Sequence, residues 1–174
     1  MGARSLHRLL LSAGAAAALL AGCGGSPVPM TSAQILRYDA GARTVDITTR
    51  AAFGAISGEM NFDGYSNGRL TLHVPYGWLV SVTCVNDSHL LLHSCAVVPD
   101  TPATLGARPL AFPEASSPDP ATGSRPGTST TFEFVANRVG SYRVACLVHG
   151  HEIDGMWDYL VVEQGVSPAA TVRH

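Results

Sequence analysis

The segment that most constrains the fold is an alternating stretch that ends in a cysteine and continues into a short loop. Tyr142, Val144 and Cys146 alternate with polar or small residues. This period of two predicts a β-strand with these three side chains on its inward face. His151 and Met156 follow within the loop. The chain therefore needs a sheet that holds a thiol at the end of one strand, with an imidazole and a thioether close behind it.

The same alternation recurs along the chain and favours an all-β domain. The chain has 174 residues, of which 46% are hydrophobic, enough for one domain with one core. Several short strands separated by turn residues are typical of a two-sheet sandwich. The predicted strands cover residues 44–48, 70–74, 80–84, 93–98, 132–134, 141–146 and 159–162.

Residues 99–131 have a different composition. They contain most of the chain's 11 prolines, with serine, glycine and alanine between them. We predict a long excursion on the surface, with a short strand at residues 110–112 within it.

The N-terminal residues have the pattern of a targeting sequence. Arg4 and Arg8 precede an apolar stretch, residues 9–20, which is too short to span a bilayer. Leu20-Ala21-Gly22-Cys23 resembles a bacterial lipobox, in which the signal peptidase cuts before the cysteine and lipid is attached to its sulfur. We therefore predict an exported protein that Cys23 anchors to the outer face of the cell membrane. The alternative is an ordinary secretory signal with a chance cysteine.

These patterns divide the chain into four predicted parts. The parts are a lipoprotein signal peptide (1–22), a lipidated flexible tether (23–40), a β-domain that includes the excursion (41–165) and a flexible tail (166–174).

The four cysteines have separate predicted roles. Cys23 is expected to carry lipid, and Cys146 belongs to the ligand-rich segment. Cys84 and Cys95 remain, on two predicted strands that face the interior, and an exported protein meets oxidising conditions. They form a candidate disulfide, and the alternative is two separate buried thiols.

The residues around Cys146 suit copper. Two histidines and a cysteine in one plane, with a distant axial methionine, define the blue (type 1) copper site. Cys146, His151 and Met156 supply three of these ligands. His93, at the start of a predicted apolar strand, is the candidate for the fourth.

The sequence resembles the cupredoxins, and most closely the sulfocyanins. The resemblance implies a cupredoxin-like Greek-key β-sandwich with one copper ion, bound by His93, Cys146, His151 and Met156. The segments that carry the resemblance are residues 62–72, 74–78, Asn86 with His93, 140–142 and 146–157.

Two positions depart from the family pattern. The family usually has asparagine after the first histidine, where this chain has Ser94, a shorter brace for the cysteine loop. It often has proline where this chain has His149, so His149 is a rival to His151. His89 is likewise a rival to His93, although no apolar strand begins directly after it.

The resemblance implies an electron carrier whose partners are respiratory redox proteins, such as a cytochrome complex or a terminal oxidase. A multicopper oxidase would need histidines on both sides of the copper cysteine, and Ala145 and Leu147 occupy those places. We therefore predict no enzymatic activity. An exported lipoprotein for copper storage or delivery would use the same ligands and is the alternative. The net charge of -2 does not indicate the basic surface that binding to nucleic acid requires.

Overall fold

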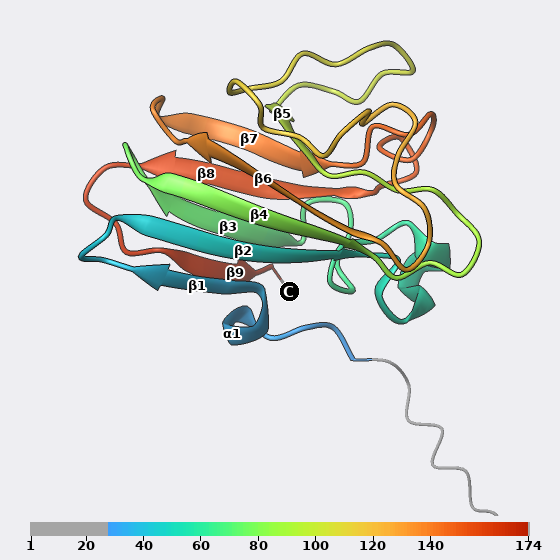
Figure 1. Ribbon diagram of the computed structural model, residues 1–174, viewed down its shortest axis with the longest axis horizontal. Helices are drawn as coiled ribbons and strands as arrows, with labels where there is room; N and C mark the ends of the chain where they lie inside the picture. Colours follow the sequence, from blue (N-terminus) through green and yellow to red (C-terminus); the bar gives the residue numbers. More distant parts are fainter. Residues whose placement is uncertain (1–27, 174) are drawn as a thin grey trace, which may run out of the picture.

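The computed structural model describes residues 28–173, which form two β-sheets packed face to face (Figure 1). One sheet has the strand order β1-β2-β4-β6, and the other has the order β5-β7-β8-β3-β9. A short helix, α1 (Ser32–Ile35), precedes β1, and an irregular 3-10 segment (Phe53–Glu59) follows β2. The strands are β1 (Leu36–Asp39), β2 (Thr44–Ala51), β3 (Leu70–Pro75), β4 (Leu79–Asn86), β5 (Ala96–Pro99), β6 (Ser129–Val135), β7 (Gly140–Ala145), β8 (Trp157–Glu163) and β9 (Ala169–Val172). Within residues 28–173 no helix is long and apolar enough to cross a membrane.

The core lies between the two sheets and follows the alternation of the sequence. β2 and β4 bury Val45, Ile47, Val80 and Val82 from one side. β8 buries its own alternate residues from the other side, and β3 buries Leu70, Leu72 and Val74 there. Each such side chain contributes about 1.5–3 kcal/mol on burial. A slip of one residue in any strand would expose this set, so the alternation fixes the register.

The register brings two connections to the same end of the sandwich. Ala145, the last residue of β7, pairs with Ala96 at the start of β5 and with Trp157 at the start of β8. The connections 87–95 and 146–156 therefore meet at that end, on the right in Figure 1.

The predicted tether and tail are too long. α1 and β1 lie within the predicted tether, and β9 lies within the predicted tail. β1 pairs with β2, and β9 pairs with β3. Both strands have only four residues, and β1 buries only Leu36, so neither shows a clear alternation in the sequence. The predicted signal peptide and Cys23 lie outside the described residues.

The Pro-rich excursion is also less exposed than predicted. Ala111, Phe112, Ala115 and Ser117 are buried, and the Phe112 ring stacks on Phe134 with 5.0 Å between centroids. Backbone bonds from this stretch reach β5 and the residue before it, but residues 110–112 form no strand. Aromatic and small residues among the prolines thus close one side of the core.

The predicted strand 93–98 begins later, at Ala96. His93 instead forms an isolated bridge with Ser124 of the excursion, through backbone bonds of 3.2 and 2.7 Å. The excursion, rather than a sheet neighbour, satisfies the backbone of this candidate ligand.

Candidate metal centre

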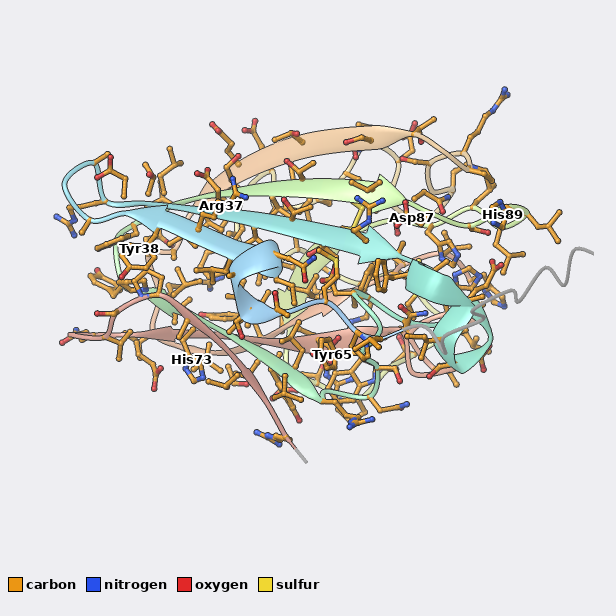
Figure 2. All side chains as sticks on the ribbon, turned by 90° about the horizontal axis from the view of Figure 1, so that it is seen from below. Arg37, Tyr38, Tyr65, His73, Asp87 and His89 are labelled. Carbon is orange, nitrogen blue, oxygen red and sulfur yellow. A yellow bond between two sulfur atoms is a disulfide. The ribbon has the colours of Figure 1, made fainter. Side chains whose placement is uncertain are left out.

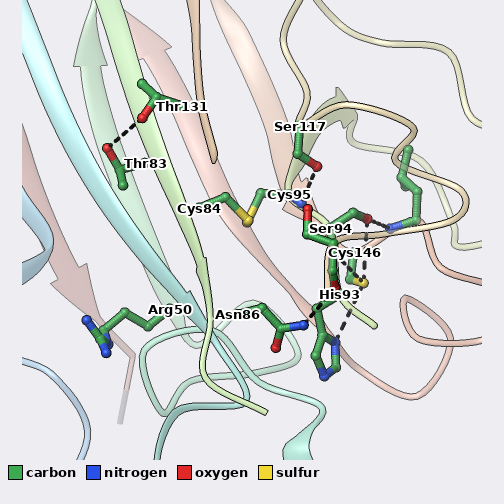
Figure 3. The surroundings of a disulfide bond; sticks show 12 residues. Arg50, Thr83, Cys84, Asn86, His93, Ser94, Cys95, Ser117, Thr131 and Cys146 are labelled. Carbon is green, nitrogen blue, oxygen red and sulfur yellow. Dashed lines mark hydrogen bonds between the residues drawn. A yellow bond between two sulfur atoms is a disulfide. The ribbon is translucent and has the colours of Figure 1, made fainter. Parts of the chain in front are cut away.

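Three predicted ligands come together where the two connections meet. The ligand atoms of His93, Cys146 and His151 all lie within 4.8 Å of one another. The Cys146 Sγ is 3.9 Å from the Nδ1 of His93 and 3.4 Å from the Nδ1 of His151. Both imidazoles thus turn the same nitrogen toward the sulfur, and Figure 3 shows His93 beside Cys146.

Met156 lies in the same part of the core. Its side chain is fully buried and belongs to the cluster that contains Cys146. The Met156 N–H donates to the His151 carbonyl at 2.9 Å, and the Cys146 N–H donates to the Met156 carbonyl at 3.1 Å. The loop 146–156 therefore closes on itself and keeps its two ends together.

Ser94 lies at the position that is predicted to brace the cysteine loop. Its backbone N–H donates to the Cys146 sulfur at 3.3 Å, and its Oγ lies 3.6 Å from that sulfur. The same Oγ accepts the N–H of Leu147 at 2.9 Å. The shorter side chain still joins the two connections.

The protonation of these groups follows from their burial. Burial raises the pKa of the Cys146 thiol, and backbone hydrogen bonds from Ser94 and Val148 lower it in part. Burial, with a smaller effect of His151, lowers the pKa of His93 to about 4. Burial also lowers the pKa of His151. Both imidazoles are therefore neutral near pH 7, which is the form that binds a metal.

Gly155 occupies a position in the loop 146–156 that favours glycine. It has φ +95°, and a Cβ there would lie 2.5 Å from the Asn67 side chain. The Asn67 N–H donates to the Gly155 carbonyl at 2.8 Å. Residues 66–68, which precede β3, therefore support the ligand loop from behind, a role that the sequence did not reveal.

The rival histidines lie elsewhere. His149 and His89 are exposed, and neither joins the cluster. Figure 2 labels His89 on the loop after β4 and His73 on the other sheet. His73 contacts Glu163 at 2.9 Å and Thr171 at 3.1 Å.

A disulfide joins Cys84 to Cys95 beside the site (Figure 3). Cys84 belongs to β4 of one sheet, and Cys95 directly precedes β5 of the other. Their Cα atoms are 5.9 Å apart, and Cys95 is two residues from His93. The bond thus ties the His93 segment to the opposite sheet. Within the described residues, Cys146 is the free cysteine.

Comparison with known proteins identifies the family. The model of the sulfocyanin (SoxE) domain matches residues 31–172. This chain belongs to the sulfocyanin family. Its relatives include sulfocyanin of Sulfolobus acidocaldarius, which is 26% identical over 137 residues, or 75% of this chain and 69% of that protein.

Solved structures of rusticyanin and auracyanin share the fold. Rusticyanin from Thiobacillus ferrooxidans matches with a TM-score of 0.56 and 20% identity over 79% of this chain and 88% of that one. Reduced auracyanin from Roseiflexus castenholzii matches with a TM-score of 0.50 and 20% identity over 68% of this chain and 96% of that one. These matches confirm the predicted cupredoxin-like β-sandwich.

The residues present in this sulfocyanin-family chain fit a copper ion. The site combines one thiol, two neutral imidazoles and one thioether, the donor set of type 1 copper. Each imidazole presents a free Nδ1 to the sulfur instead of being held by a carboxylate. One copper ion is the cofactor that this set suits.

Proposed function

We propose that this protein carries single electrons on one copper ion, which His93, Cys146, His151 and Met156 would hold. The observation that carries the proposal is the pair of neutral imidazoles whose Nδ1 atoms lie 3.4 and 3.9 Å from a buried free thiol. Bound copper supplies a one-electron couple between its two common oxidation states.

The role of the protein is to hold the four ligand side chains in place and to exclude water from them. His93, Cys146 and Met156 have no exposed surface, and His151 is the partly exposed member of the set. With four protein donors no coordination position is left for a substrate, so an electron carrier fits better than an enzyme. In this proposal the partly exposed imidazole of His151 is the route for the electron between this buried site and a redox partner.

The place of action follows from the predicted lipobox. In our proposal Cys23 carries lipid, the protein is exported, and it works at the outer face of the cell membrane. Its proposed partners are respiratory redox proteins in that membrane, such as a cytochrome complex and a terminal oxidase. Lipid labelling of the full chain should disappear in Cys23→Ser, and retained labelling would contradict the anchor.

Absorption spectroscopy of the copper-loaded protein tests the site. The wild type should show the intense visible band of a copper–thiolate bond, and Cys146→Ser should lose it because no thiolate remains. Met156→Leu should keep the band, because it removes only a weak axial donor. A colourless wild type, or a coloured Cys146→Ser variant, would contradict the ligand assignment.

Electron exchange separates the carrier from a storage or delivery lipoprotein. A carrier should reduce and reoxidise rapidly with small redox reagents and keep its copper in the presence of a chelator. Slow redox cycling together with rapid loss of copper to the chelator would favour storage or delivery.

A further inference from the structure

A group of four charged residues, whose side chains are between 5% and 27% exposed, connects the ligand loop to the Pro-rich excursion. Arg108 and Asp100 come from the excursion, Arg143 comes from β7, and Glu152 directly follows His151. Figure 1 shows the excursion, which runs from yellow-green to gold, beside β5 and β7. We call these four residues the charged network.

Glu152 is the centre of the charged network. Its Oε1 lies 3.3 Å from Nη1 of Arg108 and 3.4 Å from Nη1 of Arg143. The side chains of Glu152 and Arg108 are each 5% exposed, and that of Arg143 is 12% exposed. Among residues 28–173, no hydrogen-bond partner reaches the buried Oε2 of Glu152. The two arginines therefore supply the compensating charge for this carboxylate, as a buried charge requires.

The arginines are in turn fixed by the excursion and the sheet. Arg108 donates to the carbonyls of Pro99 at 2.7 Å and Pro102 at 2.9 Å. Arg143 bonds to Asp100 at 3.0 Å, and its guanidinium lies 3.9 Å from the centre of the Trp157 ring. Such fork-shaped contacts have a defined geometry, so the network can hold a loop in one place.

The ligand loop has little else to hold its middle. Its backbone bonds there are local turns, such as Asp154 N–H to Gly150 carbonyl at 3.0 Å and His151 N–H to Val148 carbonyl at 3.1 Å. Between residues 147 and 155, Glu152 is the one residue with a buried side chain. The long-range attachment of the backbone next to His151 is thus the Glu152 side chain.

A cavity of about 260 Å³ lies between the excursion and this loop, and Cys146 lines part of it. Leu105 and Arg108 line one side, and Val148 and Ile153 line the other. If the loop moved away from the excursion, this cavity would open toward the sulfur.

We propose that Arg108 and Glu152 are positioning residues, which hold the loop so that the His151 imidazole stays opposite the Cys146 sulfur and the sulfur stays closed to solvent. This proposal rests on the proposed copper site. Some residues orient a metal ligand without binding the metal themselves. Replacing such a residue typically lowers metal affinity 10- to 100-fold.

The test compares Arg108→Gln and Glu152→Gln with Arg125→Gln. Arg125 lies on the same excursion, its residue is exposed, and it belongs to no ion pair among the described residues, so it controls for the loss of one charge. Copper release from the holoprotein to a Cu(I) chelator is measured for each, well below its melting temperature. We expect release about 10-fold faster in the two network variants and unchanged in Arg125→Gln. If Arg108→Gln does not fold, Arg108→Lys replaces it, since lysine keeps the charge but lacks the fork.

A second measurement needs no copper. In the copper-free protein, alkylation of Cys146 by iodoacetamide is followed by mass spectrometry, and the network variants should react several-fold faster than the wild type. Unchanged copper release and alkylation in both network variants, even with lowered melting temperatures, would reduce the network to a structural role and overturn the proposal. A wild type that binds no copper while the variants still alkylate faster would overturn the proposed function but support the positioning of the loop.

Discussion

The two connections that form the site differ in how they are held. The loop 146–156 contains three of the proposed ligands, and backbone bonds among its own residues close it. The connection 87–95 contains only His93. Its support comes from distant residues, which include Ser124 of the excursion and Cys84 of the opposite sheet.

Further contacts, both local and long-range, hold the start of the His93 connection. The Asn86 amide donates to the carbonyls of Leu91 and Ser124, both at 2.9 Å. The Arg50 guanidinium bonds both oxygens of Asp87, at 2.6 and 2.7 Å. A compact loop with its own ligands can be recognised by spacing, whereas a single ligand held by the rest of the fold depends on tertiary structure.

The largest expected effect on stability comes from Asp63. Its Oδ1 accepts the Arg50 N–H at 2.8 Å, next to the Arg50–Asp87 pair, while its Oδ2 is buried without a partner among the described residues. Burial raises the pKa of Asp63 to about 8; the Arg50 N–H and charge lower it, and Asp87 raises it. The folded state therefore holds a proton that the unfolded chain releases near pH 4.

The free energy of unfolding should fall as pH rises. The stability that the neutral Asp63 provides is complete in acid and declines as pH rises from about 4 to about 8. At about 1.4 kcal/mol per pKa unit this amounts to several kcal/mol. The free energy of unfolding in urea at pH 4, 6 and 8 measures it. Asp63→Asn, which imitates the protonated form, should make the decline between pH 4 and 8 less steep, and Asp158, whose pKa burial also raises, should account for what remains. An equally steep decline in the variant would rule out Asp63 as its source.

The disulfide should have the next largest effect. Replacing both Cys84 and Cys95 with serine frees a loop with a sequence separation of 11. In the loop-entropy model this costs on the order of 3 kcal/mol of stability. The loss should loosen the His93 connection more than the loop 146–156, and hydrogen exchange of the two segments can compare them. Equal protection of residues 87–95 in both proteins would contradict this support.

Mass spectrometry of the non-reduced protein tests the bond itself. Cys84 and Cys95 should resist alkylation until a reductant is added, while Cys146 of the copper-free protein should not need one. Two alkylatable thiols at Cys84 and Cys95 under oxidising conditions would show that the bond does not form.

The sequence predicted the local features of the site well. Cys146, His151 and Met156 share one short segment after an alternating strand, and their place in the fold follows from period and spacing. The two-sheet sandwich followed from the same alternation, since each long strand has one buried face.

The parts that sequence reasoning missed depend on contacts between distant residues. Residues 93–95 look like the start of a strand, but they pair with Ser124 and Ser117 of a stretch predicted to lie on the surface. β1 and β9 are short edge strands with little alternation. Asn67 supports Gly155, and Glu152 pairs with Arg108, across separations that no local pattern reveals.

Ser94 is the direct link between the two connections, and it should give the smallest of the three effects. Ser94→Ala removes the Oγ near the Cys146 sulfur and the acceptor for the Leu147 N–H, which costs about 1 kcal/mol of stability. The hydrogen bond withdraws electron density from the sulfur, so its loss should strengthen thiolate donation and lower the reduction potential of the copper-loaded protein.

Ser117→Ala is the matched control, because Ser117 is buried and its Oγ accepts the Cys95 N–H at 3.2 Å, an interaction that does not involve the sulfur. It should cost similar stability and leave the potential unchanged. Equal shifts in potential in both variants would mean that Ser94 acts through packing alone, and an unchanged potential in Ser94→Ala would mean that the Ser94 hydroxyl does not tune the sulfur.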